Sequence, residues 1–76
     1  MKRSHAGVTY VSWPESDNRE GWTAVALYKD DATHPVMRVV FWDAVGQFVL
    51  ESVAGEVPLV VVEALIEEAK AQIQVG

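Results

Sequence analysis

The chain has 76 residues, of which 50% are hydrophobic, and its 11 acidic and 6 basic residues give it a net charge of −5. This length predicts a single domain, residues 1–76, with one core. The negative charge disfavours direct nucleic-acid binding, which depends on Lys and Arg displacing counterions from phosphates. The absence of cysteine excludes disulfides, thiolate metal sites and thiol nucleophiles.

The first residues are basic, and no apolar run of the kind found in a secretory signal follows them. We expect residues 1–6 to form a flexible basic tail. No segment is long and apolar enough for a membrane-spanning helix, so we expect no membrane partner and a cytoplasmic location.

Two segments in the first half of the chain alternate as β-strands do. The first, residues 7–13, should end at Pro14, because proline donates no ladder hydrogen bond. A polar loop over residues 15–21 leads to the second, residues 22–28. Its two sides carry Trp22, Ala24, Ala26 and Tyr28 on one and Thr23, Val25 and Leu27 on the other.

Residues 36–53 have the pattern of a β-hairpin. The four residues between its strands, 43–46, begin with Asp and end with Gly, which is typical of a tight turn. This turn pairs Arg38 with Glu51, so that the only two charges within the strands meet. The same register gathers the apolar side chains on one side of the hairpin, namely Met37, Val39, Phe41, Phe48 and Leu50.

After residue 55 the apolar period changes from two to about 3.6, which indicates a helix. Pro58 suits a first helical position because its φ is fixed, so we expect a helix over about residues 58–74. Its apolar stripe consists of Leu59, Val62, Leu65, Ile66, Ala69 and Ile73. The elements together predict an α+β fold (ββββα), a four-stranded antiparallel β-meander with one C-terminal α-helix packed on one face.

Strand alternation then places aromatic residues on the opposite face of the sheet. Trp13 joins them if Tyr10 points toward the helix, and the sequence is compatible with either register. The candidate partner-binding residues are Trp22, Tyr28, Arg38, Val40, Trp42 and Trp13. Either another protein or a second copy covers this face, or the aromatic rings fold over it and complete the core. The outer side of the helix, with Val60, Ala64 and Ala71, is a second candidate surface.

No catalytic or metal-binding pattern is present. His5 and His34 have no partner residues at a recognisable spacing. The acidic loop with Glu15, Asp17 and Glu20 lacks the spacing of a calcium-binding loop. We therefore expect a protein that is not an enzyme and uses no cofactor or metal.

Ser12-Trp13-Pro14 and Gly21-Trp22-Thr23 resemble the Trp-Pro and Gly-Trp elements of MbtH-like proteins, small partners of adenylation domains in nonribosomal peptide synthesis. That family continues into a helix and a closing Trp-Thr-Asp motif. Here two further predicted strands intervene and the motif is missing, so no residue role is carried over.

The function we favour is a small non-enzymatic protein-interaction module, homodimeric, that binds through its aromatic sheet face. An alternative is an acidic inhibitor, a nucleic-acid mimic that blocks a nucleic-acid-binding protein. This alternative is based on the carboxylates of Asp17, Glu20, Asp30, Asp31, Glu63, Glu67 and Glu68. A small-molecule binding module that uses the tryptophan face is a third possibility.

Overall fold

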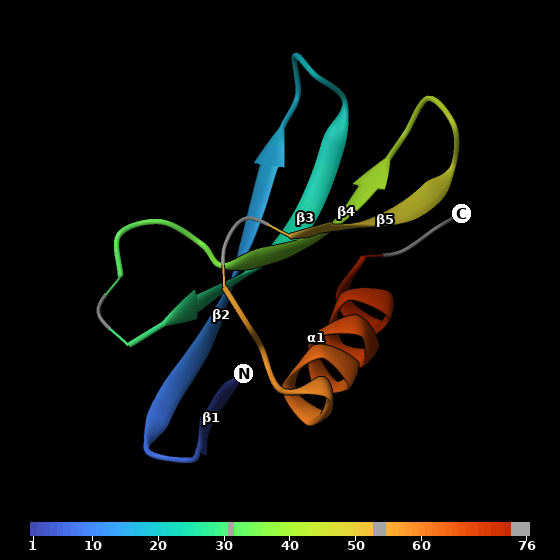
Figure 1. The fold of residues 1–76 in the computed structure, drawn as a ribbon. Coiled ribbons are helices and arrows are strands. Elements are labelled where there is room, and N and C mark those ends of the chain that lie inside the picture. The colour runs from blue at the N-terminus through green and yellow to red at the C-terminus, as the bar shows by residue number, and fades with distance from the viewer. Residues whose placement is uncertain (31, 53–54, 74–76) are drawn as a thin grey trace.

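The computed structural model describes residues 1–30, 32–52 and 55–73. It is an antiparallel sheet followed by one helix, which lies across one face of the sheet (Figure 1). The elements are β1 (Lys2–His5), β2 (Val8–Asp17), β3 (Trp22–Lys29), β4 (Met37–Trp42), β5 (Gln47–Ser52) and α1 (Leu59–Gln72). The strands follow one another across the sheet in chain order. The α+β class and the C-terminal helix are thus confirmed, but the sheet has five strands, not four.

The additional strand, β1, consists of residues that we expected to form a tail. Lys2–His5 pairs with the start of β2 in a hairpin whose loop is Ala6 and Gly7. Both loop residues have positive φ, 51° and 81°, as a two-residue turn between twisted strands requires. Alanine seldom adopts this conformation, so the residue pair Ala6-Gly7 is a weak sequence signal for such a turn.

Strand β2 continues through Pro14 to Asp17, whereas the sequence predicted that Pro14 would end it. The backbone N–H of Ser12 donates to the carbonyl of Met1, on the β1 side of the strand. Because N–H groups alternate in direction along a strand, the nitrogen of Pro14 faces the same side. The paired part of β1 begins at Lys2, opposite Val11, so the proline removes no ladder hydrogen bond there.

The hairpin formed by β4 and β5 has the predicted register. Phe41 lies opposite Phe48 and Arg38 opposite Glu51, across a turn of residues 43–46. The rings of Phe41 and Phe48 are 5.0 Å apart between centroids and tilted by 58°. Val53, which we expected to end the second strand, lies outside the described residues.

Helix α1 begins one residue later than predicted, with Pro58 at its N-cap, and the predicted end at residue 74 lies outside the described residues. Its buried side is rotated relative to the predicted stripe. Leu59 is 75% exposed, whereas Val61 is buried. Residues 59–62 are all apolar, so the sequence of the first turn does not determine which of them faces the sheet. The side chains buried from α1 onward are Val61, Leu65, Ala69 and Ile73.

The core lies between α1 and the middle of the sheet. The strand residues buried there are Tyr10, Val25, Leu27, Met37, Val39 and Phe41. Phe48 and Leu50 on β5 are on the same face, but Phe48 is half-buried and Leu50 is 49% exposed. The helix packs on β3 and β4, so it does not cover the edge strand that the sequence assigned to the core.

Candidate functional site

The face of the sheet opposite α1, called the open face below, carries all six candidate partner-binding residues. Trp13 is opposite Ala26, and Ala26 is opposite Arg38 in the next strand. Tyr10 is buried on the helix side, which settles the register that the sequence left unresolved. The open-face residues in β2 to β5 include Trp13, Glu15, Trp22, Ala24, Ala26, Tyr28, Arg38, Val40, Trp42, Val49 and Glu51.

The centre of the open face is buried by side chains of the face itself. Ala24 and Ala26 have no exposed surface, and Val40 is 3% exposed. No described helix or strand lies over them, so the long side chains around these small residues must cover them. Val40 is therefore not available to a partner in this arrangement, although the sequence placed it among the contact residues.

Arg38 extends across this centre between two carboxylates. Its Nε donates to Oε1 of Glu51 at 2.9 Å, and its Nη2 donates to the same oxygen. Its Nη1 lies 3.6 Å from Oε1 of Glu15, and its guanidinium carbon lies 5.3 Å from the centroid of the Trp22 ring. The hydrogen bond to Glu51 is the main reason why the pKa of Arg38 is raised above its usual value.

Tyr28 extends this network by binding the other carboxylate oxygen of Glu15. Its hydroxyl donates to Oε2 of Glu15 at 2.6 Å. That hydrogen bond, followed by burial, raises the pKa of Tyr28. Glu15 is absent from the predicted site residues because the sequence pattern placed it in a loop, whereas it lies in β2. The alternation of Trp13, Glu15 and Asp17 beyond Pro14 was the available signal.

The groups that remain exposed on the open face are mainly apolar. Trp13 is 59% exposed and Val49 is 44% exposed. Trp22 and Trp42 lie opposite each other in β3 and β4, and both are half-buried. The face thus presents indole rings around an ion-paired centre, an arrangement suited to contact with another protein.

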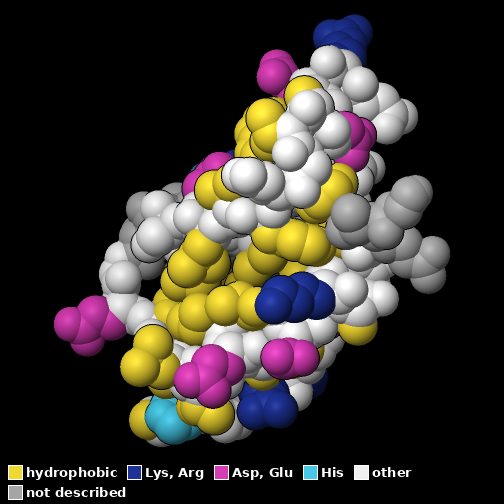
Figure 2. All heavy atoms as spheres, turned by 90° about the vertical axis from the view of Figure 1, so that its right-hand side faces the viewer, with side chains coloured by type: hydrophobic (Ala, Val, Ile, Leu, Met, Phe, Trp, Pro, Cys, Tyr) yellow, Lys and Arg dark blue, Asp and Glu magenta, His cyan; other side chains and the backbone are white. Residues whose placement is uncertain are grey.

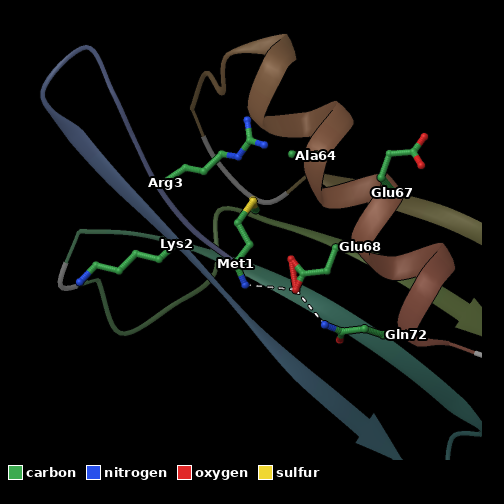
Figure 3. A pocket seen from close by; sticks show the side chains of 7 residues that line it. All are labelled: Met1, Lys2, Arg3, Ala64, Glu67, Glu68 and Gln72. Carbon is green, nitrogen blue, oxygen red and sulfur yellow. Dashed lines mark hydrogen bonds and ion pairs between the residues drawn. The ribbon is translucent and has the colours of Figure 1, made fainter.

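A second surface is the open groove between β1 and α1 (Figure 3). Ser12 donates from Oγ to Glu68 at 2.7 Å, and the amino group of Met1 lies 3.3 Å from the same carboxylate. Gln72 donates to Glu68 at 3.0 Å. This link was not predicted, because Ser12 and Glu68 are far apart in the chain and no sequence pattern connects them. Glu68 thus holds the amino group of Met1 and the side chain of Gln72, whereas Lys2, Arg3 and Glu67 line the groove with no hydrogen bond or ion pair drawn to them in Figure 3.

A third surface lies on the side where β5 and α1 meet solvent. Figure 2 shows hydrophobic side chains gathered across the middle of this side, with charged groups around them. The half-buried residues that pack against the core include Phe48, Val62 and Ile66. Leu50, on the helix side of the edge strand β5, is 49% exposed.

Chemistry beyond these contacts is sparse in the described residues. His5 is in β1, His34 is in the segment before β4, and both are exposed. Within residues 1–30, 32–52 and 55–73, no three His, Asp or Glu side chains come together as a metal site would require. No described helix has the length and apolar character needed to cross a membrane. Comparisons with protein-family models, with curated proteins and with solved structures found no match.

Proposed function

We propose that this chain is a non-enzymatic protein-interaction module that acts as a homodimer and binds a protein partner through its open face. The observation that carries the proposal is the exposure of Trp13 on the same face as two half-buried tryptophans, Trp22 and Trp42. None of the described elements covers this face. Tryptophan is a frequent anchor of protein interfaces, because it contributes a large apolar area at a low cost in side-chain entropy.

The network around Arg38 supports a protein as the ligand. Each charged group at the centre of the face already has an oppositely charged or hydrogen-bonding neighbour in the chain. A docking protein therefore meets satisfied polar groups and does not have to neutralise an isolated charge. Two hollows of the described structure lie on the helix side of the sheet, one between β1 and α1 and one along α1 beside Arg3.

No observation favours the acidic inhibitor over this function. Asp17 accepts the backbone N–H groups of Arg19 and Glu20, and Asp30 accepts that of Thr9. Glu68 binds Ser12 across the groove between β1 and α1. Asp31 lies outside the described residues. These hydrogen bonds give several of the acidic residues a local structural role.

Affinity capture followed by mass spectrometry tests the proposal. The wild-type chain is compared with Trp13→Glu, which places a charge on the exposed ring position, and with Val45→Glu as a matched control. Val45 is as exposed as Trp13 but lies in the turn between β4 and β5. We expect one protein to be retained by the wild type and Val45→Glu and lost with Trp13→Glu. Equal retention by all three chains would contradict the proposal, provided that all three unfold at similar temperatures.

A further inference from the structure

The two edges of the sheet differ in how they are protected against pairing with another strand. Edge strands present unpaired backbone groups, and charged side chains are a common protection. The edge strand β1 carries Lys2, Arg3 and His5, all exposed. The edge strand β5 carries only Glu51, whose carboxylate is bound by Arg38 within the chain. The β5 edge therefore lacks this protection.

The hydrogen bonds of the neighbouring strand β4 show which backbone groups of β5 have no partner in the sheet. The N–H of Asp43 donates to the carbonyl of Gly21, on the β3 side of β4. The backbone N–H and C=O groups of successive residues point to opposite edges of a strand, so those of Trp42 point toward β5. Gln47 lies opposite Trp42, and its N–H and C=O groups point toward β4. By the same alternation, the N–H and C=O groups of Phe48 and Leu50 point away from the sheet. No other segment among the described residues pairs with this edge.

The side chains of β5 are apolar on both sides of the sheet. Val49 is 44% exposed on the open face, and Leu50 is 49% exposed on the helix side. Phe48 is half-buried on the helix side, next to Phe41. A strand with exposed apolar residues on both faces and free backbone groups is suited to strand addition.

We propose that β5 pairs antiparallel with β5 of a second copy, about a two-fold axis at Val49. Such an axis requires the strand to be complementary to itself. With Val49 opposite Val49 of the second copy, Phe48 lies opposite Leu50 of the second copy on the helix side, and Gln47 lies opposite Glu51 on the open face. Phe48 and Leu50 are the residues whose backbone groups point outward, so they supply the hydrogen bonds between the chains. Apolar residues meet apolar residues, and an amide meets a carboxylate.

The resulting dimer has one continuous sheet. Its two open faces lie side by side on the same surface, so the exposed tryptophans of both copies remain available to a partner. This inference develops the homodimer of the proposed function but uses a different surface. The β5 edge joins the copies, and the open face binds the partner.

Light scattering on charge variants of Val49 tests the pairing, because this residue meets its own counterpart. We expect the wild-type chain to have twice the chain mass, and Val49→Lys and Val49→Glu each to have the single-chain mass. Mixing the two variants should restore the double mass, since Lys then faces Glu. Trp13→Glu and Val45→Lys should leave the double mass unchanged.

Three results would overturn the proposal: a wild-type chain that stays monomeric, a Val49→Lys chain that stays dimeric, or a mixture that stays monomeric. Dissociation by Trp13→Glu would also overturn it, because the copies would then meet through the open face. Loss of partner capture by Trp13→Glu with an unchanged mass separates the two proposals experimentally.

Amide hydrogen exchange provides an independent measurement. The amides of Phe48 and Leu50 should be protected in the wild-type dimer and should exchange at least tenfold faster in Val49→Lys. The amide of residue 49, which faces β4, should be protected in both chains and reports that the variant is folded. Fast exchange of Leu50 in a wild-type dimer would contradict pairing at this edge.

Discussion

The two faces of the sheet bury their residues in different ways, most clearly in β3. Residues 24–27 are all buried, although successive side chains point to opposite faces. Val25 and Leu27 are large and belong to the core beneath α1. Ala24 and Ala26 are small and lie beneath long side chains of the sheet itself. A helix thus provides a packed core on one face, whereas the other face has a thin cover of side chains that remain in contact with solvent.

This difference predicts unequal effects of truncation on the two faces. Leu65→Ala should lower the free energy of unfolding by about 2–5 kcal/mol, because it leaves a cavity beneath the helix. Ile66→Ala, at the next helical position, should cost less because its side chain is only half-buried. Trp13→Ala on the open face should change stability by about 0.5 kcal/mol or less. Urea unfolding measures all three, and a similar cost for Trp13 and Leu65 would refute the comparison.

A smaller effect should follow from breaking the polar link between the helix and β2. Ser12 is buried on the helix side and donates to Glu68. Ser12→Ala should cost about 1–3 kcal/mol, since the carboxylate loses a partner in a partly buried place. Glu68→Gln and the double variant complete a mutant cycle, measured by urea unfolding. Additive costs of the two substitutions would show that this link does not stabilise the helix on the sheet.

Local chemistry explains which parts of the fold could be predicted from the sequence. The register of β4 and β5 was predictable because the turn and the pairing of Arg38 with Glu51 agree on it. The continuation of β2 beyond Pro14 could not be predicted. It depends on β1 being too short to pair with the proline, and the sequence does not show where β1 lies. The rotation of α1 was also missed, because residues 59–62 are all apolar and the position of the sheet selects among them. In each of these two cases a distant segment decides the outcome.

The candidate site could be predicted only in part, for a similar reason. Strand parity alone brought Trp22, Trp42 and Arg38 to one face, together with Tyr28, but did not decide the face of Trp13. The contact between Tyr28 and Glu15 is diagonal across two strands and depends on the register of β2. The burial of Val40 depends on how long side chains lie over the face. Sequence alternation therefore identifies the face of a residue but not its exposure.

The smallest effect concerns the ionisation of Tyr28, which tests the cover of the open face directly. The hydrogen bond to Glu15 raises the pKa of Tyr28 above the ordinary phenol value of about 10. A raised pKa in the folded state means that the neutral phenol is favoured. The contribution of this hydrogen bond to stability is therefore complete below the pKa of Tyr28 in the unfolded chain and is lost as the pH rises through its pKa in the folded chain.

Glu15→Gln should lower the midpoint of the tyrosinate absorbance titration, because the neutral phenol then loses its hydrogen bond to a carboxylate. Tyr28→Phe, which leaves Tyr10 as the only tyrosine, identifies the part of the absorbance change that belongs to Tyr28. Identical midpoints for the wild type and Glu15→Gln would show that Tyr28 does not lie across the centre of the open face, and that the alanines beneath it are buried in some other way.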